Sequence, residues 1–198
     1  MKIETQLIAA AFKMIPKNST RFALNGVHIC SAQDGKAMVV GCDSYGLILL
    51  HSEFDAPEEP FTIPYEICKQ IKYTKKGVKT AEITLDGNNV SVDIGVITLK
   101  GQICDGRYPR VHAIYENYEG DKEIPSIFAA SLLTKMAQIG RLFDVDERKV
   151  HHHNNGDAAA KVVFLSDKDK PLENVIGYIM PIQAYRFDKL IKHNVTQF

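Results

Sequence analysis

Residues 2–15 of the chain read KIETQLIAAAFKMI, a short extended stretch that runs into a helical pattern. Apolar side chains recur there at the spacing of one helix face, at Leu7, Ile8, Ala11, Phe12 and Ile15. Pro16 follows and predicts the end of that helix. Three strand-like runs come next, RFALNGVHICSA, KAMVVGCDS and GLILLHSEF, and Asp34-Gly35 predicts a hairpin turn between the first two. The stretch therefore opens a unit of strand, helix and three strands.

The same order of elements occurs twice more along the chain. Residues 61–73, FTIPYEICKQIKY, predict a strand and a short helix with Pro64 at its first turn, followed by TAEITLDG, NNVSVDIG and VITLKGQIC. Residues 123–139, EIPSIFAASLLTKMAQI, predict a strand at 123–127 and a helix, followed by KVHHHNN, AAAKVVFLSD and NVIGYIMPI. The units begin near residues 2, 61 and 123, a period of about 60 residues. Three βαβββ units are therefore expected.

These units predict an α+β fold with antiparallel sheets and helices on one face. One unit alone leaves sheet face and sheet edge uncovered, so the units are expected to pair. Residues 1–115 would form a complete two-unit domain, with the segment EFDAPEEP (53–60) as an exposed connector between its halves. The remaining chain divides into a linker at 116–122, a half domain at 123–183 and a C-terminal extension at 184–198. Apolar residues of that extension, which predict either a helix packed on the molecule or a simple surface extension, are Tyr185, Phe187, Leu190 and Ile191.

The charges of the chain are balanced in number but unevenly distributed. The sequence has 24 Lys and Arg against 24 Asp and Glu, and the acidic residues collect in the connectors. Basic residues collect on or just after the predicted helices, at Lys13, Lys17, Lys69, Lys72, Lys75, Lys76, Lys135 and Arg141. This segregation is typical of a surface that binds phosphates without reading a base sequence. It is equally typical of the solvated side of ordinary amphipathic helices.

Several stretches resemble the bacterial DNA polymerase III beta sliding clamp family. The most specific are DGRYP (105–109), where the family has D-G-R-F-P, and YIMPI (178–182), near the family's C-terminal end. RFALNG, VVGCDSYGLILL and FTIPYEICKQIK match the family in the same order. Residues 1–115 resemble the whole middle domain of a clamp, and residues 123–183 resemble the second half of its last domain. The first domain and the first half of the third have no counterpart.

The resemblance implies a DNA polymerase processivity factor that encircles or contacts duplex DNA through helix lysines and arginines, without sequence specificity. It implies no catalysis and no cofactor. A family ring contains twelve units, so four chains of three units would supply one, although a dimer that pairs two half domains is a further option. Its expected partners are duplex DNA, a DNA polymerase, other clamp-binding peptides and a clamp loader. An alternative is a clamp mimic that binds replication proteins or a host clamp without encircling DNA.

The resemblance also implies a hydrophobic pocket for short peptide motifs of replication proteins. By matching positions, its residues are Leu24, Cys42, Ser44, Tyr45, Leu47, Pro109, Ile114, Tyr178, Met180, Pro181 and Ile182. Ser44-Tyr45-Gly46 stands where the family has Gly-His-Arg, and Gln183 stands where it has a terminal arginine. The peptide specificity is therefore expected to differ from that of the family.

Other chemistries find little support in the sequence. Residues 151–153 are three histidines, but on a strand only His151 and His153 share a face, and a histidine-rich edge or a surface near DNA is expected in place of a metal site. Asp43, Asp93 and Asp105 belong to no catalytic motif, so an enzyme is not expected. The four cysteines form no CxxC pair, which favours reduced thiols in a cytoplasmic protein. Arg107 is expected either to pair with an acid or to reach a phosphate.

Overall fold

The first unit of the structure follows the predicted order. The computed structural model describes residues 1–17, 19–111, 127–153, 155 and 158–182. Strand β1 (Lys2–Glu4) leads directly into helix α1 (Thr5–Phe12), and a turn carries the chain to Pro16. The elements after it are the short 3-10 helix η1 (Phe22–Leu24) and strands β2 (Gly26–Ser31), β3 (Lys36–Cys42) and β4 (Gly46–Asp55).

The second and third units repeat this order. The second contains β5 (Phe61–Pro64), α2 (Tyr65–Cys68), β6 (Thr80–Asp86), β7 (Asn89–Asp93) and β8 (Thr98–Gln102). The described part of the third contains α4 (Ala130–Leu142), the 3-10 helix η2 (Glu147–Lys149), β9 (Val150–His153), β10 (Ala160–Leu165) and β11 (Pro171–Ile179). The predicted strand at 123–127 lies outside the described residues except for Ile127, which forms an isolated bridge with Ile182.

The first two units form one domain by exchanging their opening strands. β1 of the first unit pairs with β6 of the second, and β5 of the second unit pairs with β2 of the first. The result is a four-stranded sheet of order β1-β6-β7-β8 and a second sheet that begins β5-β2-β3-β4. Each unit therefore covers one edge of the other, as expected for units that cannot bury their surfaces alone.

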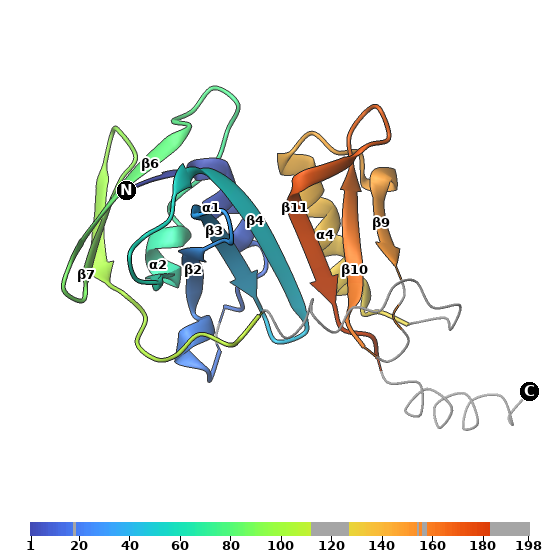
Figure 1. The fold of residues 1–198 in the computed structure, drawn as a ribbon, viewed down its shortest axis with the longest axis horizontal. Coiled ribbons are helices and arrows are strands. Elements are labelled where there is room, and N and C mark those ends of the chain that lie inside the picture. The colour runs from blue at the N-terminus through green and yellow to red at the C-terminus, as the bar shows by residue number, and fades with distance from the viewer. Residues whose placement is uncertain (18, 112–126, 154, 156–157, 183–198) are drawn as a thin grey trace, which may run out of the picture.

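The third unit extends the second sheet to seven strands. β11 pairs antiparallel with β4, with Val175 opposite Leu50 and Ile179 opposite Gly46, and the sheet order continues β4-β11-β10-β9. The third unit is thus joined to the first domain by backbone hydrogen bonds (Figure 1). All of the strand pairs within the described residues are antiparallel, which confirms the predicted α+β class.

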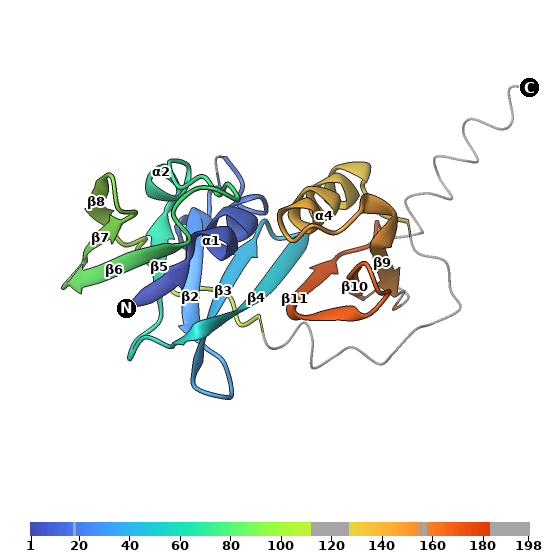
Figure 2. The ribbon, with the colours of Figure 1, turned by 90° about the horizontal axis from the view of Figure 1, so that it is seen from above.

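Within the described residues, helices α1, α2 and α4 lie along one side of the strands (Figure 2). α1 is central and contacts both α2 and α4. Its apolar face is fully buried in the main core, where Ile8, Ala11 and Met14 have no exposed surface. The helix predicted in unit three is present as α4, and its Leu132, Met136 and Ile139 are buried in the same core, whereas Phe128 lies before its first residue and is half-buried.

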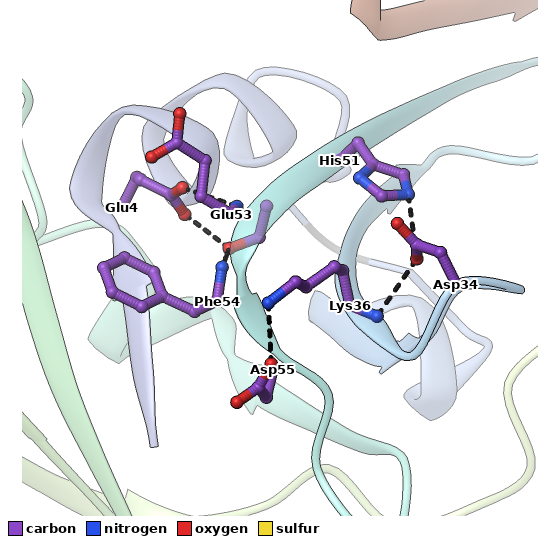
Figure 3. Close-up of polar contacts among 8 residues, drawn as sticks. Glu4, Asp34, Lys36, His51, Glu53, Phe54 and Asp55 are labelled. Atoms are coloured by element: carbon purple, nitrogen blue, oxygen red, sulfur yellow. Dashed lines mark hydrogen bonds and ion pairs between the residues drawn. The ribbon is translucent and has the colours of Figure 1, made fainter.

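A polar network fastens β1 to the neighbouring strand β4 (Figure 3). The Glu4 carboxylate accepts a hydrogen bond from Ser52 Oγ (2.6 Å) and another from the Glu53 N–H (2.9 Å). The Phe54 N–H donates in turn to Ser52 Oγ (3.1 Å). Because these bonds engage both carboxylate oxygens, Glu4 holds the start of α1 against the seven-stranded sheet.

Three local predictions differ from the structure. Residues 22–24 form a 3-10 turn and not the start of a strand. The N–H groups of Leu24 and Asn25 donate hydrogen bonds to the carbonyls of Arg21 and Phe22, and these bonds form a turn before β2. β4 continues through Asp55 into the predicted connector, since it pairs with β3 as far as Lys36. β11 begins at Pro171, before the predicted start at residue 174.

The expected linker at 116–122 and extension at 184–198 lie outside the described residues. Within the described part of the chain, no helix has the length and apolar character needed to span a membrane.

Candidate DNA face and peptide pocket

The sequence-predicted basic residues lie in the chain on or after helices α1, α2 and α4, and they fall into two groups. Five of them are exposed and form no ion pair with any described residue, namely Lys13, Lys17, Lys69, Lys72 and Lys76. Lys13 and Lys69 directly follow the last residues of α1 and α2. A cation at that position also interacts favourably with the helix dipole, so a structural role and a phosphate-binding role are compatible.

The other three basic residues are engaged by carboxylates. Lys75 Nζ lies 2.7 Å from Asp144 Oδ1, and this hydrogen bond raises the pKa of Lys75. Lys135 pairs with Asp43, and Arg141 pairs with Glu147. A phosphate group would have to compete with these carboxylates, so the cationic surface is carried chiefly by the five lysines above, which we call the lysine face.

The predicted pocket residues meet where β4 joins the third unit. A cavity of about 110 Å³ is lined by Cys42, Ser44, Tyr45, Gly46, Leu47, Ala159, Tyr178 and Met180. Six of these were predicted, and Leu24 belongs to the buried apolar cluster that Cys42, Leu47, Ala159 and Tyr178 share. The cavity is smaller than the roughly 150 Å³ apolar cavity that holds benzene. It has room for one small apolar side chain, with Tyr45 and Met180 exposed at its rim by 68% and 39%.

Besides Leu24, four predicted pocket residues do not line this cavity. Pro109 is exposed, whereas its neighbour Tyr108 packs on the apolar cluster and Val111 belongs to it. Pro181 and Ile182 follow β11 outside the lining, and Ile114 lies outside the described residues. Ala159 and Gly46 were missed, because small residues carry no sequence signal for a cavity wall that distant strands complete.

A tight turn between β3 and β4 forms the rim of the pocket. Asp43 Oδ1 accepts hydrogen bonds from the N–H groups of Tyr45 (3.1 Å) and Gly46 (2.8 Å). Ser44 adopts a φ of 75°, a left-handed conformation that side chains rarely adopt. The Met180 N–H donates to the Tyr45 carbonyl (2.7 Å), which ties the end of β11 to the turn. Because Lys135 of α4 binds the other oxygen of Asp43, the rim is linked to the helical side of the molecule.

The pocket has no features of a catalytic site. Burial raises the pKa of the Cys42 thiol, against a smaller opposing effect of its hydrogen bond from Ser44. The pKa of Cys30 is raised to about 11 and that of Cys68 to about 12, in both cases chiefly by burial. Thiols in such surroundings stay protonated and unreactive at neutral pH. All four cysteines are free in the structure.

The segment CDGRYPRV (104–111) contacts β2 and β5, and through Tyr108 and Val111 it joins the apolar cluster beneath the pocket. Its Tyr108 ring stacks flat on the His28 ring, with a centroid distance of 4.0 Å and an interplanar angle of 2°. Burial lowers the pKa of His28 to about 4, so this imidazole is neutral at physiological pH. Arg107 is exposed and forms no ion pair with a described residue, which leaves its predicted roles untested.

The histidine run forms the outermost strand of the described sheet. His151 and His152 are exposed on β9, and the His152 ring contacts Phe128 edge-on at a centroid distance of 5.0 Å. Within the described residues, no group of three or more His, Cys, Asp or Glu side chains is placed to hold a metal ion.

A further hollow of about 780 Å³ lies where the first and third units meet. It is bordered by Glu4, Gln6 and Leu7 at the start of α1, by Phe143 after α4, by residues 51–53 of β4 and by residues 170–174 at the start of β11. These two strands stop pairing after Leu50 and Val175, so the groove arises where they diverge. Its open shape and mixed charges, which include Glu53, Glu173 and Lys170, show no convergent set of polar groups.

No protein-family model matches this chain, and no curated protein matches it. Its architecture, in contrast, matches solved structures over 92% of its length.

The matching structures are bacterial replication clamps. The sliding clamp of Pseudomonas aeruginosa, solved with a ligand, has a TM-score of 0.67 at 12% identity over 92% of this chain and 65% of the clamp chain. The sliding clamp of Bartonella birtlesii, bound to griselimycin, has a TM-score of 0.67 at 11% identity over 92% of this chain and 66% of its own. The DNA polymerase III beta subunit of Thermotoga maritima has a TM-score of 0.60 at 12% identity over 92% and 65%. This chain thus spans about 65% of the length of these clamps and has, in a shortened form, the fold of the bacterial DNA polymerase III beta sliding clamps.

Proposed function

We propose that the chain is a sliding-clamp-like DNA polymerase processivity factor of the cytoplasm that contacts duplex DNA without sequence specificity. The observation that supports the proposal is the lysine face, five exposed lysines that form no ion pair with a described residue, of which Lys13 and Lys69 directly follow α1 and α2. Such residues bind the phosphate backbone, which has the same charge at every base pair. The role is one of binding and tethering, with no chemical step.

We propose that the pocket between Tyr45 and Met180 binds short peptide segments of a DNA polymerase or of other replication proteins. Its floor is apolar, its volume of about 110 Å³ suits one aliphatic side chain, and its rim is open to solvent. A single anchor of this size supplies about 1.5–3 kcal/mol of burial free energy. Affinity would therefore depend on further contacts along the rim, where Ser44 and Tyr45 determine which peptides fit.

Encirclement of DNA requires more than one chain. A single chain spans about 65% of a matching clamp chain, and its seven-stranded sheet ends at β9 within the described residues. We propose a homo-oligomer, with four chains of three units as the number that matches a twelve-unit ring, opened by a clamp loader.

Charge reversal on the lysine face tests the DNA contact. Replacing Lys69, Lys72 and Lys76 together by Glu should weaken binding to a duplex at ~100 mM salt by at least about tenfold. It should also reduce the slope of log K against log salt by about 2–3, because each lost phosphate contact contributes about 0.9.

The matched control reverses three exposed lysines outside the lysine face, Lys100 of β8 and Lys168 and Lys170 between β10 and β11. It changes the net charge equally and should leave most of the affinity. Equal losses in both triple variants would contradict a localised DNA face and favour a general effect of net charge.

The pocket is tested with N-acetyl-leucine amide, a probe with one leucine side chain. We expect saturable changes in the methyl NMR signals of Met180 and Leu47, and their loss in Met180→Glu. The control Ile97→Glu alters another exposed apolar residue and should respond like the wild type. An unchanged response in Met180→Glu would contradict the assignment of the pocket.

A further inference from the structure

The rim of the pocket is a turn that its own backbone does not favour. Ser44 adopts a φ of 75° there, and a residue other than glycine in this conformation costs free energy. The backbone closes the turn with a hydrogen bond from the Asp43 N–H to the Gly46 carbonyl (3.1 Å). Two further N–H groups, those of Tyr45 and Gly46, donate to the Asp43 side chain. The conformation of the rim therefore depends on where the Asp43 carboxylate is held.

Helix α4 packs against the sheet directly behind the pocket. A Cβ atom at Gly46 of β4 would lie 3.2 Å from a methyl carbon of Leu132. A Cβ atom at Gly177 of β11 would lie 2.9 Å from the sulfur of Met136. These two glycines therefore let α4 lie close to the junction between β4 and β11.

The pocket and α4 occupy opposite faces of these two strands. Leu47 and Tyr178 follow the two glycines in the chain and lie opposite each other in the β4–β11 pair. Both belong to the apolar cluster of the pocket, and successive side chains of a strand point to opposite faces of a sheet. The turn lies at the end of β4, where a long side chain of α4 can reach around the sheet to the rim.

Lys135 makes this connection. It lies one helical turn after Leu132, and its Nζ binds Asp43 Oδ2, while the N–H groups of the turn bind Oδ1. The side chain of Asp43 is only 10% exposed, and a carboxylate buried to this extent is costly without a cation beside it. If Lys135 were neutral, Asp43 would turn towards solvent, and the N–H groups of Tyr45 and Gly46 would lose their acceptor.

We infer that Lys135 is a positioning residue of the pocket: it holds Asp43, and Asp43 holds the turn that carries Tyr45. The effect extends to β11, because the Met180 N–H donates to the Tyr45 carbonyl (2.7 Å). Lys135 therefore serves the pocket and not the lysine face. This role rests on the proposed peptide binding, and it makes the affinity for a peptide depend on a helix residue that does not line the cavity.

Amide hydrogen exchange of the full chain tests whether Lys135 holds the turn. The amides of Tyr45, Gly46 and Met180, which we call the rim amides, are the donors that depend on Asp43 or on the turn. In Lys135→Met they should exchange at least about tenfold faster relative to the amides of β3, because the turn opens locally. Lys135→Arg keeps the cation and should return them towards the wild-type rate.

Lys149→Met is the matched control. Lys149 belongs to the same unit, its side chain is 28% exposed against 30% for Lys135, and its Nζ lies 3.0 Å from Asp169 Oδ1. The substitution therefore removes an equal charge and an ion pair without touching the turn. It should leave the rim amides with their wild-type exchange.

A double variant tests the electrostatic cause. Asp43→Asn combined with Lys135→Met removes both charges, while the amide oxygen at residue 43 can still accept the two N–H bonds of the turn. The double variant should regain most of the rim protection that Lys135→Met alone loses.

The affinity for N-acetyl-leucine amide, followed by the methyl NMR signal of Met180, tests the consequence for binding. Lys135→Met should raise the dissociation constant at least about fivefold, because only molecules with a formed rim can bind. Lys149→Met and Lys135→Arg should bind like the wild type. In the wild type itself, the side-chain Nζ signal of Lys135 should shift with the probe, and that of Lys149 should not.

The two proposals fail in different ways. Wild-type exchange of the rim amides in Lys135→Met, an equal loss of protection in Lys149→Met, or a double variant no better than Lys135→Met would each overturn the positioning role. Unchanged probe affinity in a variant whose rim amides exchange faster, or a Lys135 signal that ignores a bound probe, would overturn it as well. If the wild type does not bind the probe but its rim amides depend on Lys135, the proposed peptide pocket fails and the control of the turn by Lys135 stands.

Discussion

Gly41 is the closest contact between α1 and the sheet. A Cβ atom at this position would lie 2.2 Å from the carbonyl oxygen of Ala11, a backbone atom in the middle of the core. The sequence offers no sign of this, because a glycine in a strand is also compatible with a bulge or a weak pairing. The close approach depends on a helix that lies 30 residues earlier in the chain.

Gly41→Ala should therefore destabilise the protein by about 2–4 kcal/mol, because the helix backbone has to move away from the sheet. Gly101→Ala is the matched control, since its Cβ would meet only the flexible end of Ile67, at 3.1 Å. Its expected cost is below about 1 kcal/mol. Urea unfolding measures both, and equal losses would contradict the packing described for α1.

His28 should make the stability of the protein depend on pH between about 4 and 6.5. Burial lowers its folded-state pKa to about 4 from an ordinary value of 6.5. In this window the unfolded chain takes up a proton that the folded chain does not, so stability is full above pH 6.5 and decreases as the pH falls. The expected loss is about 2–3 kcal/mol.

His28→Phe tests this, because phenylalanine keeps a ring against Tyr108 and cannot titrate. Urea unfolding of the variant at pH 4, 5, 6 and 7 should show a flatter dependence than the wild type. The exposed His151→Gln is the control and should follow the wild type. Parallel curves for wild type and His28→Phe would exclude His28 as the source.

At the scale of elements, the sequence predicts the helices and strands that depend on local residue pattern. The alternation of Val90 and Val92 correctly predicted β7, because both side chains are buried on the same face of a half-exposed strand. The repeat correctly predicted the order of the helices and strands. It could not predict that β1 and β5 would be exchanged, because edge pairing is decided by partners about 80 and 35 residues away.

The pocket residues also divide into those that the sequence predicts and those that depend on distant parts of the chain. Cys42, Leu47 and Tyr178 were predicted from the family resemblance and lie together in the structure. Ala159 was not, because its place in the wall depends on how β10 begins beside Tyr178. The link from Lys135 to Asp43 was also missed, because the two residues are 92 positions apart.

The Lys135–Asp43 pair should fasten α4 to the sheet more strongly than the other ion pair of the same helix. The side chain of Asp43 is only 10% exposed, whereas Arg141 and Glu147 are exposed by 64% and 56%. A double-mutant cycle of Lys135→Met and Asp43→Asn should give a coupling of about 1–3 kcal/mol. The same cycle with Arg141→Met and Glu147→Gln should give less than about 1 kcal/mol. Similar couplings in the two cycles would show that burial does not distinguish these pairs.

At the scale of the whole molecule, one seven-stranded sheet runs through the first and third units, and helices α1, α2 and α4 lie along one side of the strands (Figure 2). The lysine face belongs to segments on or after two of these helices, with Lys13 after α1 and Lys69 after α2. The balanced net charge of the chain hides this segregation, because the acidic connectors offset the helix lysines in number. In the ring around DNA that we propose, the lysine face would meet the phosphate backbone.

Retention on DNA of defined topology tests that assembly most directly. The full chain, with a clamp loader if one is required, is placed on a nicked circular plasmid and separated by gel filtration in ~150 mM salt. The account predicts that protein elutes with the circle and is released when one restriction cut makes the DNA linear. Equal retention on circular and linear DNA, or none on either, would contradict encirclement; a chain that instead binds a replication protein without DNA would be a clamp mimic.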